Sequence, residues 1–433
     1  MGGRVVVAPD KFKGSLTAAE VAGRVAAGLA GGGFGGEIVT QPVADGGDGT
    51  VAAAVSAGFR RVELPVHGPT GTPVTAAYAL RGSVAVVEAA QACGLTLLPA
   101  GALAPLTATS RGVGELILAA RRAGATRIVL GVGGVATTDG GAGLVQALGA
   151  RLTDASGREL PPGGGALGHL ARLDLAGLAD LSGVEFLLAS DVDNPLLGPY
   201  GAAAVYGPQK GASPSDVPVL EAGLRQWADV AEAAGLAAAE AAGLAAAEAA
   251  GLAGEPTARD ASGAGAAGGL GFAALLFLGA RMRPGIELLL ELASFGSLLD
   301  GARLVITGEG SLDAQTLHGK APVGVARAAA AHSPAVPVVA VAGRCTLTAA
   351  ELRAAGIARC YALADLEPDL GRSIAQAGPL VERLASRIAA DWLRLTTAAE
   401  AGRPVARRPP ACQAVARAPA LLAVIRLMAG PTA

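Results

Sequence analysis

The sequence predicts an α/β protein whose sheets are largely parallel. Short runs of β-branched residues alternate with alanine-rich stretches of helical character, the pattern of repeated strand–helix units. A chain of 433 residues is long enough to bury the cores of two or three domains. The clearest strand candidates are residues 4–8, 37–43, 84–88, 127–133, 184–189, 303–307 and 336–341.

Almost every predicted strand runs directly into a polar, glycine-rich turn. In open α/β sheets such turns gather at the carboxyl edge of the strands, where ligands bind. We therefore expect a functional site that is built from many separate loops.

The charge balance disfavours several classes of partner. The chain has 34 Lys and Arg residues against 36 Asp and Glu residues, a formal net charge of −2, and its main body has no basic stripe. Nucleic acids and membrane surfaces select basic patches, so we expect neither as a partner and favour small molecules. An uncharged run at residues 262–280 opens with glycines, which favours a loop entering a buried helix over a membrane span.

The cysteines and the N-terminus predict a reduced, cytoplasmic protein. The apolar stretch that follows Met1 is too short for a secretory signal. The cysteines lack metal-ligand spacing and are too few for a disulfide framework in so long a chain. They are Cys93, Cys345, Cys360 and Cys412.

Lysine is rare, and its positions point to phosphate chemistry. Only four of the 34 basic residues are lysine, and all four lie in glycine- and acid-rich segments. A compact ammonium on a flexible stem can follow a moving phosphate, whereas the arginine fork is rigid. Ordinary surface placement explains any single lysine equally well, but explains all four together less well. These residues are Lys11, Lys13, Lys210 and Lys320.

The first chemically suggestive segment joins the strand at residues 4–8 to a helix that begins near Thr17. Thr17 and Glu20 have the spacing of a capping box, in which side chains satisfy backbone N–H groups at the helix start. Charged and polar residues just ahead of a helix N-terminus favour an anion site. The residues placed there are Asp10, Lys11, Lys13 and Ser15.

The second segment, residues 44–50, places Asp45 and Asp48 beside Gly46 and Gly47. Carboxylates on a flexible backbone can hold magnesium or orient a hydroxyl, but Asp-Gly is also the commonest turn chemistry. Taken alone, the segment favours a turn.

The third segment, residues 131–143, connects a strand to a helix through small residues. The backbone amides of Gly133 and Gly134 can approach a polyphosphate closely. No Gly-Lys-Ser/Thr closes the loop, so it is not a Walker A sequence. Further hydroxyl and capping contacts can come from Thr137, Thr138 and Asp139.

Residues 263–268 match the Gly-x-Gly-x-x-Gly dinucleotide pattern, but Arg-Asp-Ala-Ser precedes them where a strand is required. A nicotinamide-dependent dehydrogenase that used these glycines is therefore disfavoured. Hydride transfer also has no need of the acid- and lysine-bearing loops.

Two further segments carry acids. Asp191 and Asp193 follow a predicted strand two residues apart, so an extended backbone places them on one face, as magnesium ligation or base catalysis requires. Asn194 lies beside them, and Lys210 follows in Gly-Pro-Gln-Lys-Gly-Ala. The last segment, residues 307–322, supplies Glu309, Asp313, Lys320 and His318, the last better explained as a loop hydrogen-bonding residue than as a base.

Together these segments resemble the class I glycerate kinases. The matching motifs run in the family's order from residue 4 to about residue 395. They are Ala-Pro-Asp-Lys-Phe-Lys-Gly-Ser-Leu, Ala-Asp-Gly-Gly-Asp-Gly-Thr, Gly-Val-Gly-Gly-Val-Ala-Thr-Thr-Asp-Gly-Gly, Asp-Val-Asp-Asn-Pro-Leu, Gly-Pro-Gln-Lys-Gly-Ala, Gly-Ala-Gly-Ala-Ala-Gly-Gly and Ile-Thr-Gly-Glu-Gly-Ser-Leu-Asp.

The resemblance implies ATP-dependent phosphorylation of D-glycerate, usually to 2-phosphoglycerate. It also implies a two-domain fold, in which a Rossmann-like parallel-sheet domain is assembled from residues 1–67 and 285–398 and a second α/β domain, residues 68–284, is inserted. Two segments fall outside it. An alanine-rich repeat of period eight at residues 232–250 is expected to extend a helix or form a surface loop, and the basic tail at residues 399–433 is expected to be disordered.

The chemistry of the reaction suggests roles for the candidates. Magnesium and lysine neutralise a triphosphate, while a carboxylate accepts the proton of the attacking hydroxyl. We assign the base or metal-ligand role to Asp191 with Asp193 beside it, and a further metal-ligand role to Asp313. Phosphate or carboxylate contacts are assigned to Lys11, Lys13 and Lys210.

Nucleotide cradling is assigned to the glycine loops at residues 131–134 and 308–310. The complete set of substrate- and nucleotide-binding candidates is Asp10, Ser15, Asp45, Gly46, Gly47, Asp48, Gly133, Gly134, Thr137, Thr138, Asp139, Asn194, Gly308, Glu309, Gly310, Asp313 and Lys320.

Several alternatives stay open from sequence alone. The 2- and 3-hydroxyls of a bound three-carbon acid differ by small shifts, so 3-phosphoglycerate or a related hydroxy acid is a second reading of the kinase. A non-catalytic homologue that binds nucleotide is a third. Oligomeric state is also open, with a homodimer as one option.

Overall fold

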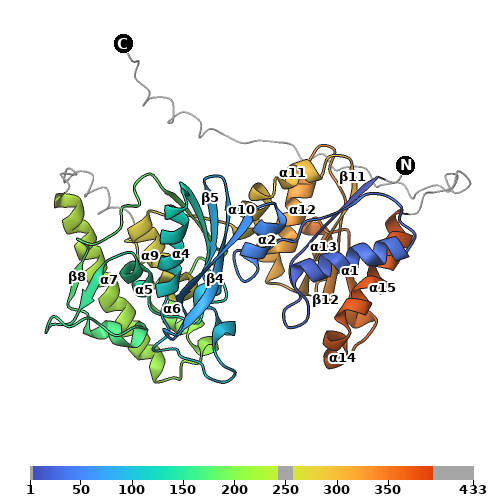
Figure 1. Ribbon diagram of the computed structural model, residues 1–433. Coiled ribbons are helices and arrows are strands. Elements are labelled where there is room, and N and C mark those ends of the chain that lie inside the picture. The colour runs from blue at the N-terminus through green and yellow to red at the C-terminus, as the bar shows by residue number, and fades with distance from the viewer. Residues whose placement is uncertain (1–2, 242–256, 394–433) are drawn as a thin grey trace, which may run out of the picture. The chain divides into compact units, whose positions relative to one another are not determined.

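The computed structural model describes residues 3–241 and 257–393, and these form two main sheets (Figure 1). The first sheet is five-stranded and entirely parallel, with strands drawn from both ends of the described chain. Its order is β13 (Arg359–Ala362), β12 (Val338–Cys345), β11 (Ala302–Leu312), β1 (Arg4–Pro9) and β2 (Ile38–Thr40).

The second sheet has six strands and is mixed. β10, β9, β6 and β5 run parallel, whereas β5, β4 and β3 pair antiparallel. Its order is β10 (Arg281–Arg283), β9 (Glu185–Ala189), β6 (Arg127–Gly131), β5 (Val84–Glu88), β4 (Pro73–Arg81) and β3 (Arg60–His67). A separate hairpin pairs β7 (Arg151–Thr153) with β8 (Arg172–Asp174).

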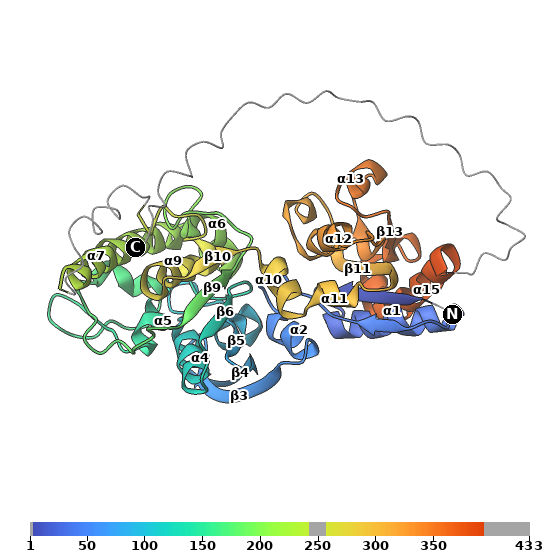
Figure 2. The same ribbon diagram turned by 90° about the horizontal axis from the view of Figure 1, so that it is seen from above.

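Helices cover both faces of the five-stranded sheet. Successive apolar side chains of β1 point to opposite faces of this sheet, so both faces need to be covered. Val5 and Val7 pack against α1 (Ala18–Gly31) and α15 (Ala377–Ile388). These two helices, from opposite ends of the described chain, lie side by side in both views (Figures 1 and 2). Val6 and Ala8 face the opposite core, which is built from α10 (Gly285–Leu292), α11 (Phe295–Leu298), α12 (Ala321–Ala331) and α13 (Ala349–Ala354).

The six-stranded sheet is also covered on both faces. One face packs against α2 (Thr50–Ser56) and α10. The other packs against a larger set of helices: α3 (Ala90–Cys93), α4 (Arg111–Arg122), α5 (Ala142–Ala147), α6 (Ala202–Tyr206), α7 (Asp216–Ala241) and α9 (Ala266–Leu278). The α10 helix therefore belongs to two cores, with Ile286 and Leu290 in one and Leu288 and Leu289 in the other.

These observations confirm the predicted α/β class and the parallel strands. The predicted capping box is present, since Thr17 Oγ1 accepts the Glu20 N–H and the Glu20 carboxylate accepts the Thr17 N–H. Strand lengths differ from prediction in two notable places. β2 is confined to Ile38–Thr40, and β11 extends through Leu312 because Gly308, Glu309 and Ser311 pair with β12.

The division into two domains stays a prediction, but the strand pairing shows where the chain passes between the sheets. It leaves the first sheet after β2 and enters the second at β3, before the predicted boundary at residue 67. It returns between β10 and β11. Both passages bear on the site described below.

The repeat at residues 232–250 lies partly outside the described residues. Its first part continues α7 to Ala241, in line with the expected helix extension, and the remainder is outside. The tail at residues 399–433 lies wholly outside them. Within the described ranges, no helix is both long and apolar enough to cross a membrane.

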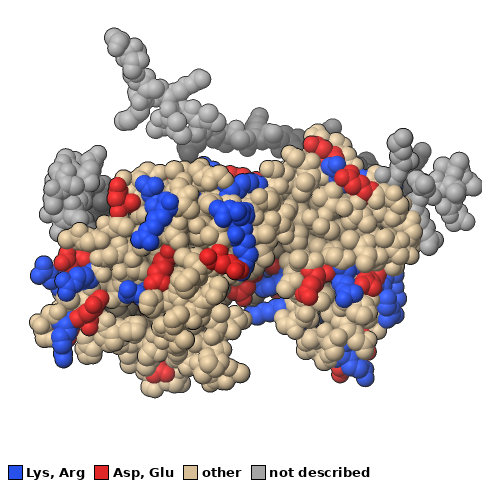
Figure 3. Space-filling view, viewed as in Figure 1, with Lys and Arg blue, Asp and Glu red and all other residues tan. Residues whose placement is uncertain are grey.

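The surface carries mixed charge on the face shown in Figure 3. Acidic and basic side chains are interspersed there, with broad uncharged areas between them. Many charges are paired; for example, Arg24 Nη1 lies 2.7 Å from Glu382 Oε1 and links α1 to α15. Exposed pairs of this kind contribute little to stability.

Candidate active site

Three neighbouring cavities lie at the carboxyl ends of strands from both sheets. Pocket A, about 470 Å³, is lined by residues that include Asp45, Gly133, Asp191 and Lys320. Pocket B, about 820 Å³, is lined by residues that include Asp10, Lys11, Asp48 and Glu309. Pocket C, about 230 Å³, is lined by residues that include Asp191, Asp193, Arg283, Glu287 and Arg327.

Pockets A and B share part of their walls, and so do pockets A and C. Ser190, Asp191, Val192 and His318 line both A and C. Six residues from four segments of the chain line both A and B: Lys13, Asp45, Gly47, Gly133, Gly134 and Lys320. The predicted loops are therefore brought together, and two lysines lie where the larger cavities meet.

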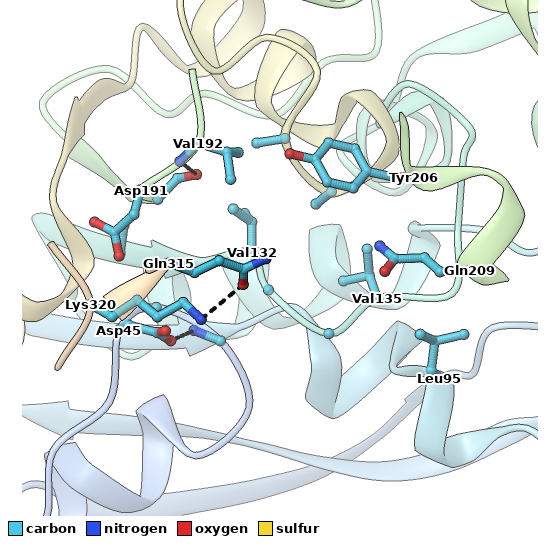
Figure 4. Close-up of a pocket in the computed structure, with 18 of the residues that line it drawn as sticks. Asp45, Leu95, Val132, Val135, Asp191, Val192, Tyr206, Gln209, Gln315 and Lys320 are labelled. Carbon is cyan, nitrogen blue, oxygen red and sulfur yellow. Dashed lines mark hydrogen bonds between the residues drawn. The ribbon is translucent and has the colours of Figure 1, made fainter. Parts of the chain in front are cut away.

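Figure 4 shows how pocket A is divided. Asp191, Asp45 and Lys320 lie toward one side of the close-up, and Lys320 Nζ donates to Gln315 Oε1 at 3.2 Å. Tyr206 and Leu95 lie toward the other side. One part of the pocket is thus charged, and the other is aromatic and aliphatic.

Close backbone packing explains several of the glycines. The Gly133 N–H donates to Gly46 O at 3.1 Å, and a Cβ on Gly133 would lie 2.5 Å from Gly47 Cα. Gly46 has a φ of +99°, and a Cβ there would lie 2.5 Å from Ala189 O. These glycines let the loop after β2 lie directly against the loops after β6 and β9.

We expect Gly285→Ala to disturb the same packing. The new Cβ would lie 1.9 Å from Asp45 O, a backbone atom that can move only with its loop. Overpacking of this kind costs about 1–3 kcal/mol of unfolding free energy. The midpoint temperature of thermal unfolding and kcat should both fall. Gly296→Ala is the matched control, because a Cβ there meets nothing within 4 Å; equal losses in both variants would contradict the steric argument.

Glu88, which the sequence did not predict as a site residue, holds the loop that contains Asp45 and Asp48. Its buried carboxylate accepts the Gly49 N–H at 3.2 Å and the Val51 N–H at 2.8 Å, at the start of α2. Burial raises the pKa of Glu88, and these two hydrogen bonds oppose the rise. The carboxylate thus holds the segment that presents Asp45 and Asp48.

Pocket B concentrates carboxyl groups. Burial, and then the neighbouring Asp45 carboxylate, raise the pKa of Asp10 to about 7, against the opposing effect of Lys11. Asp10 Oδ1 accepts the Lys11 N–H at 2.7 Å, while Lys11 Nζ donates to Asp48 O. Burial also raises the pKa of Glu309, whose carboxylate accepts the Thr316 hydroxyl. Negative charge is therefore costly here unless a cation accompanies it.

Asp191 stands between pockets A and C. Its Oδ1 accepts the Gly285 N–H at 3.1 Å. Although the side chain is open to the pocket, the surrounding protein raises its pKa to about 6 by desolvation, and Asp45 and Glu287 add to the rise. Asp193 lines pocket C alone among the three cavities.

Asn194 supports the site without lining any of the three cavities. Its Oδ1 accepts the Tyr206 hydroxyl at 2.6 Å, and its Nδ2 donates to Tyr200 O at 2.8 Å. Tyr206 itself lines pocket A. The predicted binding residue is therefore placed to orient an aromatic wall.

Lys210 and Asp139 lie beneath the loop that follows β6. Lys210 lines pocket A but is only 3% exposed, and its Nζ donates to Thr137 O at 2.5 Å. Burial lowers the pKa of Lys210 to about 8, while Cys93 and Asp139 oppose the change. The Asp139 carboxylate accepts N–H groups from Ser110, Gly141 and Gly143 and the Ser110 hydroxyl.

Neither Asp139, Thr137 nor Thr138 lines the cavities; all three are buried. The geometry therefore gives this group a role in bracing the loop that presents Gly133 and Gly134. To contact a ligand directly, the Lys210 ammonium group would have to divide its N–H donors between the ligand and Thr137 O.

The expected glycine loop at residues 308–310 is not a loop. These residues belong to β11, where a Cβ on Gly308 would lie 2.2 Å from Val341 O of β12. The glycine permits close strand packing, and Gly308 lines none of the three cavities. Glu309 and Gly310 do line pocket B, as does Ser15, whose hydroxyl donates to Phe12 O at 3.1 Å.

The two predicted metal ligands line different cavities: Asp191 lines A and C, and Asp313 lines B. Asp313 Oδ1 accepts the Gln315 N–H at 2.9 Å and so also holds a turn. Across the described residues, no cluster of three or more His, Cys, Asp or Glu is arranged to hold a metal ion. A metal here would need ligands from a bound substrate.

The glycines at residues 263–268 have a packing explanation. A turn precedes them rather than a strand, so the context of a dinucleotide-binding loop is missing. The Gly265 N–H donates to Asn194 O at 2.9 Å, and a Cβ on Gly268 would lie 2.2 Å from Thr137 O. These glycines therefore let the start of α9 approach the loops that frame pocket A.

Comparison with known proteins agrees with the motifs. Residues 5–393 match the model of the glycerate kinase family. The chain is 44% identical to a glycerate kinase of Bacillus subtilis (strain 168), covering 89% of this chain and 97% of the relative. It is 42% identical to a glycerate 2-kinase of Escherichia coli (strain K12), covering 79% and 86%.

A solved structure is also similar. It is a crystal structure provisionally assigned as glycerate kinase 2 from Salmonella typhimurium LT2, with a TM-score of 0.71 and 40% identity over 90% of this chain and 98% of that one. With the family model spanning nearly all the described residues and relatives above 40% identity, the chain belongs to the glycerate kinase family.

Proposed function

We propose that this protein transfers the γ-phosphoryl group of ATP to D-glycerate and forms 2-phosphoglycerate. The observation that carries the proposal is the shared wall of pockets A and B, where Lys13 and Lys320 face both cavities beside Gly133 and Gly134. In phosphoryl transfer, the terminal phosphate of the nucleotide must meet the hydroxyl of the acceptor beside positive charge. The protein supplies mainly positioning and charge, with little other chemistry. The names of the relatives support glycerate as the acceptor and the 2-position as the site of attack.

The volumes suggest which ligand occupies which cavity. At about 820 Å³, pocket B is the larger and suits the nucleotide, with its triphosphate directed toward Lys13 and Lys320. At about 470 Å³, pocket A suits the three-carbon acid, beside Asp191. Lys11, which also lines pocket B, would contact the polyphosphate from the other side.

Asp191 is the proposed general base. Its pKa of about 6 leaves it ionised at neutral pH, yet basic enough to accept the proton of the attacking hydroxyl as the bond to phosphorus forms. The Gly285 N–H fixes Oδ1, which leaves Oδ2 free to face the substrate. Asp193, beside it, adds negative charge and lines pocket C.

Magnesium fits pocket B as a partner of the nucleotide. The Asp45 carboxylate raises the pKa of both Asp10 and Glu309, and Glu309 adds to the rise at Asp10, so a cation would relieve that repulsion. Mg²⁺ in such enzymes commonly uses one or two carboxylates and completes its shell with phosphates and water. When bound, it would neutralise charge on the transferring phosphoryl group; orientation of the triphosphate remains with the lysines and the backbone amides.

The cytoplasm is the proposed location. Cys93, Cys345 and Cys360 are free thiols in the described part of the chain, as expected in a reducing compartment. The proposed substrates, ATP and a small organic acid, are also metabolites of the cytoplasm. A homodimer stays a prediction.

The test is to incubate the purified protein with ATP, D-glycerate and Mg²⁺ and to identify the product by phosphorus NMR while ADP release is measured. We expect 2-phosphoglycerate, and loss of turnover when EDTA removes the metal. Formation of 3-phosphoglycerate would keep the kinase and overturn the regiochemistry. Nucleotide binding without turnover on glycerate or related hydroxy acids would favour the non-catalytic alternative.

A further inference from the structure

One wall of pocket B is mainly apolar and partly exposed. It includes Ala364, Glu367 and Pro368 and, from α14 (Leu370–Ala375), Leu370, Ser373 and Ile374. Leu370 is 70% exposed and Ile374 is 43% exposed, although both are large hydrophobic side chains. They are four residues apart on a helix and so share one side of it. Exposed apolar groups inside a cavity favour a ligand that displaces water from them.

Hydrogen bonds stabilise the start of α14. The Asp369 side chain caps α14 by accepting the Arg372 N–H at 2.8 Å, and Arg372 Nη2 donates to Glu367 at 3.1 Å. Glu367 also accepts the Asp369 N–H at 3.0 Å. These bonds hold the start of the helix, and among the described residues Leu370 and Ile374 keep their exposed surface.

The same cavity is charged along its other walls. Asp10, Lys11 and Lys13 line it just after β1, and Lys320 lines it at the start of α12. Pocket B therefore combines an ionic part with an apolar part. Glycerate has no apolar group that could cover Leu370 and Ile374, whereas ATP joins a planar base to a triphosphate and matches both parts.

We propose that the purine ring of the nucleotide binds against the α14 surface, defined as Ala364, Pro368, Leu370 and Ile374. This rests on the proposed function, because it takes ATP as the occupant of pocket B. The ring lies on the aliphatic side chains, and the triphosphate extends to Lys13 and Lys320, where the glycerate cavity begins. The rival position is pocket A, whose wall contains the Tyr206 ring.

The proposal is tested by comparing ATP with inorganic tripolyphosphate, which lacks the base, in calorimetric titrations. The double variant Leu370→Ser/Ile374→Ser should bind ATP at least about tenfold more weakly, because a buried apolar contact is lost on each side chain. Its affinity for tripolyphosphate should match that of the wild type. In steady-state assays the KM for ATP should rise, while the KM for D-glycerate stays unchanged.

Val219→Ser is the matched control, since Val219 is 46% exposed and lines none of the three cavities; both affinities should be unchanged. Equal ATP affinity in the double variant and the wild type would overturn the placement of the base. If Tyr206→Ala instead weakened ATP and spared tripolyphosphate, the base would lie in pocket A. Failure of the wild type itself to bind ATP would overturn the proposed function, and the inference with it.

Discussion

Asp191→Asn should lower kcat by about a hundredfold or more, the scale of a lost general base. The amide keeps the size of the side chain and can still accept the Gly285 N–H, but it cannot accept a proton from the glycerate hydroxyl. The fold should therefore survive while turnover fails. Initial rates of ADP release at saturating ATP and D-glycerate measure the loss. Near-normal turnover would remove Asp191 from the mechanism.

The pH dependence adds a second readout. Since the pKa of Asp191 is raised to about 6, wild-type kcat/KM should fall as the pH drops through that value and the carboxylate takes up a proton. Asp191→Asn should lack this acid limb, and Asp193→Asn should retain it. Asp300→Asn, an exposed acid outside the three cavities, serves as the control for a lost surface charge and should leave rate and profile unchanged.

Asp10→Asn should stabilise the ligand-free protein at pH 8. The folded-state pKa of Asp10 is raised from 3.8 to about 7, so between these values the folded state binds more protons than the unfolded state. The stability that Asp10 contributes is then fully present below about pH 4, and it is lost as the pH rises through about 7. Ionised Asp10 costs on the order of a few kcal/mol at pH 8. The neutral amide avoids this cost while still accepting the Lys11 N–H.

Denaturant unfolding at pH 5 and pH 8 measures the effect. The difference between Asp10→Asn and the wild type should grow with pH. Asp154→Asn is the opposite control: hydrogen bonds from Ser156 and Arg158 lower the pKa of Asp154 to about 2, so its removal should destabilise the protein at neutral pH. A pH-independent difference for Asp10→Asn would show that Asp10 is not held near protonation in the fold.

Local patterns predicted much of this fold, because its parallel strands are short buried runs with clear ends. The strand at Val84–Glu88 and the helix start at Thr17 were both evident from residues close in sequence. The antiparallel pair β3 and β4 was not predicted. In β3 only Val66 is buried, and prolines stand at Pro65 and Pro73, so what makes these residues strands is their pairing with each other.

The sequence identified the loops of the candidate site, but it did not predict how deeply each of their side chains is buried. Lys11 and Lys210 look alike in the sequence, yet Lys11 lines pocket B and Lys210 is buried against Thr137 O. Glu88 gave no signal because its partners, Gly49 and Val51, are distant in sequence. The α14 surface does have a sequence signal, because Leu370 and Ile374 are four residues apart in a segment that is otherwise mostly polar.

The chain passes between its two sheets twice, and both passages run through the site. The outward passage contains Asp45, and the return passage contains Gly285, whose N–H holds Asp191. Any rotation of one sheet against the other must bend these two strips of backbone. The backbone that connects the two sheets and the proposed site therefore coincide. A ligand that contacts both Asp45 and Asp191 would therefore restrict rotation of one sheet against the other.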